Sequence, residues 1–308
     1  MSFKVKIVIA GGTGFLGKVL INYFRKNSEL FVLTRGKSLV MDDVSYIHWD
    51  AKTVGDWATA LEKADAVINL TGKSVDCRYT EANKQLIYSS RLDSTAAIGQ
   101  AILKCKEPPK VWINSGSATI YRHSEDKEMD ELTGEIGSGF SVDVCKKWEE
   151  TFNRFNLSRT RKVIMRTGIV LGNEGGPLKP LCRLAKTGFG GRQGNGNQFV
   201  SWLHADDFAA IVEVLIKNEN LNGVFNVTAP APLRNVQFME DLRKSSRVKV
   251  SLPMPKWLLE IGAAIIQTET ELILKSRRVV PRRLLDAGFE FKYPTALVAL
   301  KDLCSINK

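Results

Sequence analysis

The chain has 308 residues, of which 44% are hydrophobic and 25% charged, an ordinary composition for a soluble globular protein with a sizeable core. Its apolar stretches are shorter than the roughly 20 residues that a membrane span needs. Residues 1–10 also lack the order of a secretion signal. These features argue against an integral membrane protein, and we expect a cytoplasmic protein without a membrane partner.

The formal net charge is +11, and basic proteins bind nucleic acids chiefly through phosphate groups. The Lys and Arg residues are scattered along the chain, which favours a solvated surface and recognition of small anions over nucleic-acid binding, the minor alternative. The five cysteines are widely spaced and form no Cys-x-x-Cys pair. They therefore indicate reduced thiols and no metal site.

The first predicted elements are a strand over residues 4–10, a glycine-rich turn over 11–17 and a helix-like stretch over 18–24. In such a turn, Gly11 permits the sharp bend, Gly14 lets a pyrophosphate approach the backbone, and Gly17 lets the helix pack closely on the strand. The helix start adds free N–H groups that bind phosphate. The turn therefore predicts a dinucleotide site made by Gly11, Thr13, Gly14, Phe15, Leu16 and Gly17.

Further short apolar runs alternate with helical patterns, the longest of which covers about 81–105. The predicted strands after the first are 29–34, 45–49, 66–70, 110–115 and 162–167. Buried strands separated by helices indicate an α/β fold, a doubly wound parallel sheet of the Rossmann type.

After Thr167 the alternation of strands and helices gives way to glycine-rich segments at 172–177 and 188–197. A predicted helix over 206–217 and a predicted strand over 223–227 follow. A smaller helix-rich lobe is expected from about residue 230. We therefore expect a cofactor domain of residues 1–167 plus 204–228, and a smaller substrate lobe of residues 168–203 plus 229–308.

The end of the second strand favours NADP(H) over NAD(H). An acidic residue usually binds the ribose 2′-hydroxyl of NAD at this place, but the chain has Arg35, whose guanidinium suits a 2′-phosphate. The alternative is a surface arginine. Asp50 is expected either to accept a hydrogen bond from adenine or to cap a helix. The next two strand ends add Leu70, Thr71, Gly72, Ser115 and Gly116.

Several motifs together resemble one family. They are residues 11–17, 65–72, 115–121, 166–172, 194–207, 226–230 and 279–289. With them, the chain resembles the extended short-chain dehydrogenases/reductases of the NAD-dependent epimerase/dehydratase family, and within these the atypical, YfcH-like "epimerase family protein" subgroup with its small C-terminal domain. Arg91 and Arg166 complete the residues expected to bind the cofactor.

The resemblance implies a catalytic Tyr and Lys four residues apart on one helix, in which the lysine lowers the pKa of the tyrosine. No Tyr-x-x-x-Lys sequence occurs in the chain, and alignment of the helix puts Ser141 and Cys145 at the two positions. Neither residue can replace its counterpart, so the usual proton relay is lost. We expect Cys145 to be a packing residue.

Three other residues are candidates for the chemistry. Ser117 matches the serine of the family's triad and can hydrogen-bond a substrate carbonyl. Tyr121 matches a tyrosine that ordinarily forms a pocket wall, with proton donation as the alternative. His204 is a candidate proton donor or a cap for its neighbours, and Asp207 is expected to start a helix.

Two functions remain open. The first is an NADP(H)-dependent oxidoreductase or epimerase acting on a small polar or nucleotide-sugar-like substrate. The second is a non-catalytic NADP(H)-binding sensor or scaffold, which the missing Tyr–Lys pair favours. The expected partner is a small molecule, and a homodimer is compatible with either function.

Overall fold

The computed structural model describes residues 4–266 and 269–305, which are built around an eight-stranded sheet. The strand order is β11-β7-β6-β5-β1-β2-β4-β3, and all pairs are parallel except β3 with β4. The strands are β1 (Val5–Ala10), β2 (Ser28–Thr34), β3 (Leu39–Met41), β4 (Val44–His48), β5 (Ala66–Asn69), β6 (Val111–Ser117), β7 (Arg161–Thr167) and β11 (Gly223–Val227).

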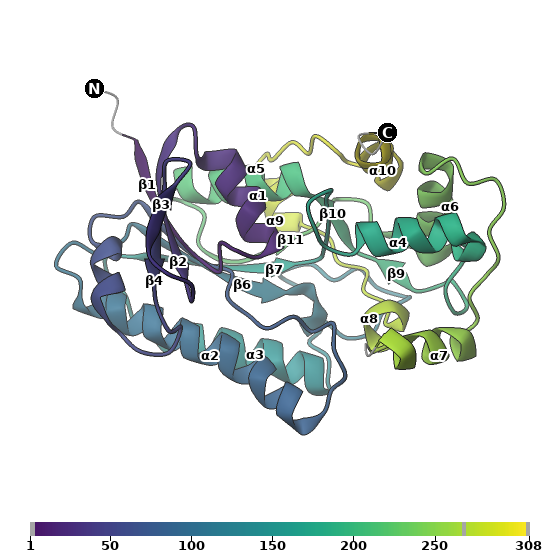
Figure 1. Cartoon of the computed structure of the whole chain (residues 1–308), viewed down its shortest axis with the longest axis horizontal. Coiled ribbons are helices and arrows are strands. Elements are labelled where there is room, and N and C mark those ends of the chain that lie inside the picture. The colour runs from purple at the N-terminus through teal and green to yellow at the C-terminus, as the bar shows by residue number, and fades with distance from the viewer. Residues whose placement is uncertain (1–3, 267–268, 306–308) are drawn as a thin grey trace.

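Helices cover both faces of this sheet (Figure 1). The helices α1 (Phe15–Phe24) and α5 (Ala205–Lys217) lie on one face, and α2 (Glu81–Lys104) and α3 (Phe140–Asn153) lie on the other. Alternate residues of β1 point to opposite faces, so that Ile7 and Ile9 join one buried cluster while Val8 and Ala10 join the other. The strand is therefore apolar along its whole length.

Most of the remaining elements gather at the right of Figure 1, beyond the carboxyl ends of the strands. Two small sheets pair β8 (Ile169–Leu171) with β10 (Trp202–His204), and β9 (Phe199–Val200) with β12 (Leu233–Arg234). The helices are α4 (Leu178–Leu184), α6 (Asn235–Ser245), α7 (Lys256–Ile266), α8 (Glu271–Leu274), α9 (Arg282–Asp286) and α10 (Ala296–Ser305), and the short turns are η1 (Asp56–Leu61), η2 (Ala118–Ile120) and η3 (Ala185–Phe189).

The doubly wound parallel sheet that the sequence predicts is confirmed. Two details differ from the prediction. Helix α1 begins at Phe15, within the glycine-rich segment, because Gly14 already serves as its N-cap residue. The short antiparallel strand β3 was not predicted, because all three of its residues are exposed and leave no burial pattern. No helix in the described residues is both long and apolar enough to cross a membrane.

Candidate cofactor and active site

The glycine-rich turn after β1 has a backbone that only glycine fits well. Gly11 has a φ of +81°, and a Cβ atom there would lie 2.9 Å from the carbonyl carbon of Leu70. A Cβ at Gly17 would lie 2.4 Å from Gly12 Cα. No side chain caps the start of α1, and Thr13 and Gly14 are exposed at the tip of the turn. The turn therefore offers free amide groups to an anion.

A second glycine-rich segment packs on the start of this helix. Cβ atoms at Gly172, Gly175 and Gly176 would each lie 2.8–2.9 Å from the nearest ring atom of Phe15. The absence of side chains at these positions lets the segment after β8 lie directly against the Phe15 ring. Phe15 is thus a packing residue through its ring, and its contribution to a cofactor site would come from its backbone.

A hollow of about 450 Å³ lies beside the turn, at the end of β2. It is lined by Gly12, Thr13, Thr34 and Gly36, and one of its walls comes from β3. Its charged lining residues are Lys18, Arg25, Lys37, Asp42 and Glu174. Arg35 is exposed next to this hollow but does not line it. The hollow thus adds Lys18, Arg25 and Lys37 to Arg35 as cations near the predicted 2′-phosphate position, and the role of Arg35 stays a prediction.

Asp50 is engaged in a local turn. Its Oδ1 accepts hydrogen bonds from the backbone N–H groups of Lys52 and Thr53, both at 2.8 Å, and its Oδ2 accepts one from the Thr53 hydroxyl at 2.6 Å. These hydrogen bonds lower the pKa of Asp50 to about 2. The carboxylate caps a turn rather than a helix, since η1 begins only at Asp56. A contact with adenine stays a prediction.

The ends of β5 and β6 are joined by buried polar side chains. The amide of Asn69 donates to Asn114 Oδ1 at 2.8 Å and to the Thr95 hydroxyl of α2 at 3.1 Å. Trp148 of α3 donates to the same hydroxyl at 3.0 Å, and Asn69 Oδ1 accepts from Thr71 N–H at 3.1 Å. This network fixes the backbone that leads into residues 70–72. Ser115 and Gly116 lie on the neighbouring strand and are both buried.

Arg91 lies against this same segment. A Cβ at Gly72 would come within 3.1 Å of its guanidinium carbon, and the guanidinium lies 5.1 Å from the centre of the Trp148 ring. Its Nη1 donates to the Ile87 carbonyl at 3.0 Å. The structure therefore places Arg91 beside Gly72, in agreement with a shared role for the two residues.

Ser141 and Cys145 lie one turn apart on α3. Burial raises the pKa of the Cys145 thiol to about 12, although Arg91 and Arg277 both act to lower it. Tyr79, from the loop before α2, packs its ring edge-on against Phe140 at 4.8 Å and brings its hydroxyl close to Ser141. The structure thus adds Tyr79 and Arg277 to the predicted residues. The sequence carried no signal for either, because each comes from a separate segment.

Tyr121, Arg166 and Glu149 form a cluster in which Tyr121 is buried and the two charged side chains are largely buried. Arg166 binds both carboxylate oxygens of Glu149 at 2.8 Å and donates to the Tyr121 hydroxyl at 2.9 Å. That hydroxyl also lies 2.9 Å from Asn226 Oδ1, and the Tyr121 side chain is fully buried. The hydroxyl already has partners on several sides, which suits the predicted wall role better than proton donation. Ser117 caps η2 by accepting from Thr119 N–H at 3.2 Å.

The structure places His204 next to the C-terminal segment. Its ring stacks on Tyr293 with a centroid distance of 3.7 Å, its Nδ1 accepts from Asp206 N–H at 3.0 Å, and its Nε2 lies 3.4 Å from Asp302. Burial lowers the pKa of His204. Asp207 is in the first turn of α5, as expected, and its carboxylate accepts from two backbone N–H groups at 292–293. In the described residues no hydrogen bond joins His204 to Ser117 or Tyr79.

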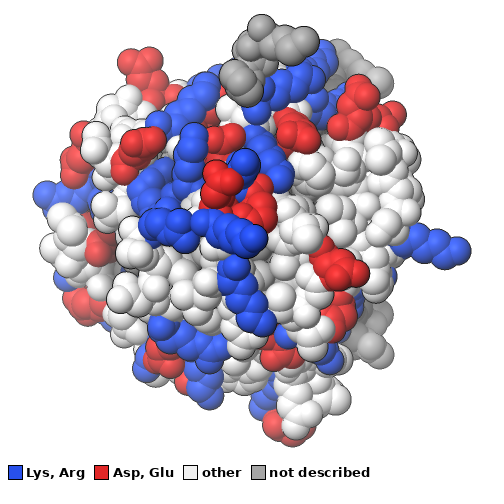
Figure 2. Space-filling model, turned by 90° about the vertical axis from the view of Figure 1, so that its left-hand side faces the viewer, with Lys and Arg blue, Asp and Glu red and all other residues white. Residues whose placement is uncertain are grey.

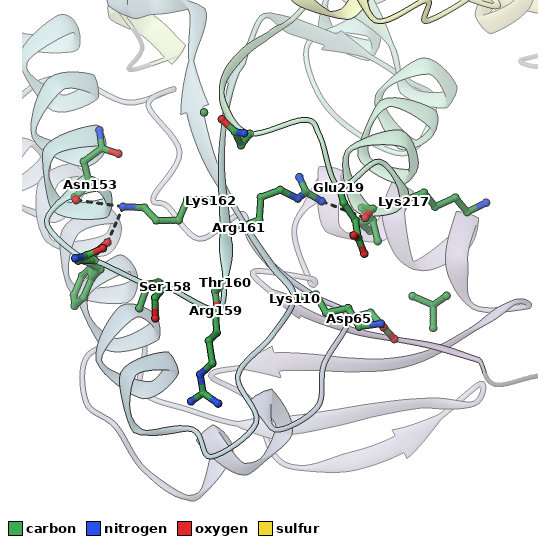
Figure 3. A pocket seen from close by; sticks show the side chains of 17 residues that line it. Asp65, Lys110, Asn153, Ser158, Arg159, Thr160, Arg161, Lys162, Lys217 and Glu219 are labelled. Atoms are coloured by element: carbon green, nitrogen blue, oxygen red, sulfur yellow. Dashed lines mark hydrogen bonds and ion pairs between the residues drawn. The ribbon is translucent and has the colours of Figure 1, made fainter.

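A second hollow, of about 1060 Å³, lies at the opposite edge of the sheet, where β1, β6, β7 and β11 begin (Figure 3). Its cations already have partners. Lys110 pairs with Asp65 at 2.8 Å, Lys162 donates to the Phe155 carbonyl at 2.8 Å, and Arg161 donates to the Leu215 carbonyl at 2.6 Å. The face shown in Figure 2 likewise mixes basic and acidic side chains. Of these two hollows, the one at the carboxyl edge lies beside the glycine turn and has the chemistry of a dinucleotide site.

Comparison with known proteins identifies the family. The model of the NAD dependent epimerase/dehydratase family matches residues 7–147, and that of a domain of unknown function, DUF1731, matches residues 254–303. An epimerase family protein of Staphylococcus aureus is 32% identical over 97% of this chain and 98% of its own length. The chain belongs to the NAD-dependent epimerase/dehydratase family. The resemblance seen in the sequence is thereby confirmed.

Solved structures agree with this assignment. The human epimerase family protein SDR39U1 (isoform 2), solved with NADPH, has a TM-score of 0.87 and 28% identity, covering 97% of this chain and 99% of that one. The UDP-N-acetylglucosamine 4-epimerase from Bacillus cereus has a TM-score of 0.76 at 18% identity, over 98% and 99% of the two chains. At that identity, the second match supports the fold alone.

Proposed function

We propose that the protein binds NADP(H) and uses it as an oxidoreductase or epimerase-type enzyme on a small polar substrate. The observation that carries this proposal is the exposed, uncapped glycine turn at 11–17 with a hollow directly beside it that is lined by three cations and two carboxylates. The turn suits a pyrophosphate, and the hollow, with Lys18, Arg25 and Lys37, suits the additional 2′-phosphate. The human relative of 28% identity, solved with NADPH, supports the same cofactor.

The residues present fit a dinucleotide along the whole carboxyl edge. Gly11 cannot carry a side chain without meeting Leu70, and the buried Thr71 hydroxyl has no hydrogen-bond partner among the described residues. A ribose hydroxyl would satisfy it. Gly72 and Arg91 continue this line toward α3. We propose that the turn holds the pyrophosphate and that Thr71, Gly72 and Arg91 hold the ribose next to the nicotinamide.

A bound nicotinamide cofactor supplies or accepts a hydride, and the protein must hold the substrate carbon against it. Ser117 stands at the end of β6 and is the candidate for orienting a substrate carbonyl. We further propose that the protein is cytoplasmic and forms a homodimer, and that it is divided into a cofactor lobe and a substrate lobe. Its expected partner is a small molecule, with neither nucleic acid nor a membrane as a partner.

Cofactor choice can be tested by titrating NADPH and NADH against the protein at one fixed salt concentration and following nicotinamide fluorescence. We expect the wild type to prefer NADPH. A Lys37→Ala variant, alone and combined with Arg35→Asp, should bind NADPH about 10- to 100-fold more weakly, because each charged hydrogen bond to phosphate contributes about 1.5–3 kcal/mol. NADH affinity should hardly change.

The exposed cation Lys301 on α10 provides a matched control, and Lys301→Ala should leave both affinities within about 2-fold, as expected for a distant surface charge. An unchanged preference for NADPH in the Lys37 and Arg35 variants would contradict the 2′-phosphate assignment. Failure of the wild type to bind either nucleotide would contradict the proposed function itself.

A non-catalytic NADP(H) sensor or scaffold is the second candidate, because Ser141 and Cys145 stand where the family's Tyr and Lys are expected. The two functions predict different behaviour. An enzyme should oxidise bound NADPH in a single turnover with at least one member of a carbonyl and sugar-nucleotide panel. A sensor should show no turnover and should instead change its association state between NADPH and NADP⁺, which gel filtration measures.

A further inference from the structure

Ser141 and Cys145, at the two positions where the family's proton relay is expected, cannot transfer a proton or carry a charge at neutral pH. Ser141 has a buried hydroxyl without a hydrogen-bond partner among the described residues, and a serine hydroxyl is a poor acid near neutral pH. Cys145 is buried, and with a thiol pKa of about 12 it is neutral at physiological pH. Neither residue supplies a proton or a positive charge.

A phenol lies directly beside the first of these positions. The hydroxyls of Tyr79 and Ser141 face each other, closely enough for Ser141 to act to lower the pKa of the phenol, and in the described part of the chain neither buried hydroxyl has any other hydrogen-bond partner. Buried tyrosine hydroxyls usually have a partner. The backbone of Tyr79 is fixed, because its N–H donates to Glu269 Oε1 at 3.0 Å. The backbone of Tyr79 is thus held in place, and its hydroxyl can still donate a hydrogen bond to a further acceptor.

A cation lies beside the second position. The Arg91 guanidinium is close enough to Cys145 and Tyr79 to act on both, and no carboxylate of the described residues forms an ion pair with it. Arg277, from the C-terminal lobe, approaches the same two residues, and its Nη2 is buried without a hydrogen-bond partner. Its nearest carboxylate oxygen, on Glu271, is 4.0 Å away and also binds Lys275 at 2.7 Å. Because the two buried guanidinium groups have so few carboxylate partners, a negatively charged group placed beside them would be stabilised.

We propose that Tyr79 and Arg91 serve the roles that the family's tyrosine and lysine serve elsewhere, those of proton donor and of the cation that stabilises the phenolate. Tyr79 is the proton donor to the substrate, and Arg91, assisted by Arg277, stabilises the phenolate that remains. The phenol and the cation reach the same place on α3 from the loop before α2 and from the middle of α2. This inference rests on the proposed function, because it needs the nicotinamide cofactor beside Tyr79.

The reaction balances with NADPH as the reductant. In the reduction of a carbonyl group, a bound NADPH would supply the hydride, with its two electrons, to the carbonyl carbon, and the Tyr79 hydroxyl would give its proton to the carbonyl oxygen. An alcohol and NADP⁺ result, and water returns a proton to the Tyr79 phenolate. Burial raises the pKa of Tyr79, and the nearby Glu271, Cys77 and Glu269 raise it further while Ser141 acts to lower it. The hydroxyl therefore carries its proton at neutral pH, as a donor must.

The placement of Tyr79 can be tested without a substrate. The chain has six tyrosines, and labelling their Cζ carbons with ¹³C lets NMR follow each phenol through a pH titration. The resonance that is lost in Tyr79→Phe identifies Tyr79. A phenol beside the nicotinamide should titrate at lower pH with saturating NADP⁺, whose ring is positively charged, than with NADPH, by about one pH unit or more.

Tyr88 is a matched control. Its ring also packs on Phe140, at 5.6 Å, but its hydroxyl donates to Asp143. The Tyr88 resonance should titrate alike with NADP⁺ and NADPH, and Tyr88→Phe should leave the Tyr79 difference intact. Equal Tyr79 titrations in the two nucleotide complexes would overturn the inference while leaving the cofactor proposal standing. Failure to bind either nucleotide would overturn both.

Arg91 gives an independent measurement if Tyr79→Phe does not fold. Arg91→Met should raise the pH at which the cofactor-sensitive tyrosine titrates in the NADP⁺ complex, and Arg91→Lys should restore part of the shift, since it restores the charge. An unchanged titration in Arg91→Met would contradict the role of the cation. With a substrate in hand, Tyr79→Phe should lower kcat by about 100-fold or more at similar KM, and Tyr88→Phe should not.

Discussion

Single residues of the cofactor turn meet two separate constraints, conformation and space. Gly11 needs a positive φ and also lies so close to Leu70 that no side chain fits. Gly288 shares the first constraint, with a φ of +76°, but has open space where a Cβ would point. The pair therefore separates the cost of the backbone conformation from the cost of the contact.

We expect Gly11→Ala to lower the free energy of unfolding by about 3 kcal/mol or more and to weaken NADPH binding, because it adds a backbone clash to the strained φ. Gly288→Ala should cost only about 1–2 kcal/mol and leave binding unchanged. Urea unfolding and NADPH fluorescence measure the two effects. Equal losses of stability in the two variants would show that the contact with Leu70 has no energetic weight.

At the scale of elements, α2 packs tightly on the segment after α3. Gly99 stands in the middle of α2, where glycine weakens a helix by about 1 kcal/mol relative to alanine. A Cβ there would lie 2.5 Å from the Phe155 ring. The glycine is therefore explained by packing and not by helix propensity.

Gly99→Ala should destabilise the protein by about 1–3 kcal/mol despite the better helix propensity, because the Phe155 ring must move. The double variant Gly99→Ala with Phe155→Leu should recover part of this loss, which a double-mutant cycle from urea unfolding measures. A Gly99→Ala single variant more stable than the wild type would contradict the packing argument.

The sequence predicted the elements that bury apolar residues on both faces, such as β1 and β6, because their apolar runs are continuous. It missed β3, which is short and exposed. The same distinction holds for the site. The glycine turn is contiguous in sequence, so the pattern identified it. Tyr79 and Arg277 reach α3 only through tertiary folding, and no spacing along the chain predicts such a meeting.

At the scale of the whole molecule, buried polar contacts hold the C-terminal segment, residues 276–305, against the eight-stranded sheet and the helices that cover it. Asp207, which is 1% exposed, accepts hydrogen bonds from the N–H groups of Lys292 and Tyr293 at 2.9 and 3.0 Å. Asn226 of β11 donates to the Val280 carbonyl at 3.0 Å. The neighbouring Asp206 is more exposed: its carboxylate pairs with Lys292 at 3.0 Å, accepts a long hydrogen bond from the Tyr293 hydroxyl at 3.4 Å and lies 3.9 Å from His204 Nδ1.

Asp207→Ala should therefore cost about 2–5 kcal/mol of unfolding free energy, since it leaves two largely buried N–H groups unpaired. Asp206→Ala should cost less than about 1 kcal/mol, as is usual for exposed ion pairs. Urea denaturation of the two single variants provides the comparison. If Asp206→Ala lowered the free energy of unfolding as much as Asp207→Ala does, the buried Asp207 carboxylate would not be the contact that holds the C-terminal segment.

The contacts of Ser276 and Arg277 also determine the order in which parts of the chain can fold during synthesis. Ser276 donates to the Ser124 carbonyl across 152 residues, and Arg277 Nε donates to the Thr119 carbonyl across 158. At about 5–20 residues synthesised per second, the segment at 119–124 waits roughly 8–30 s on the ribosome for these partners. The glycine turn can form long before that. A growing chain should thus form its glycine turn first and complete the contacts of residues 119–124 only as synthesis ends.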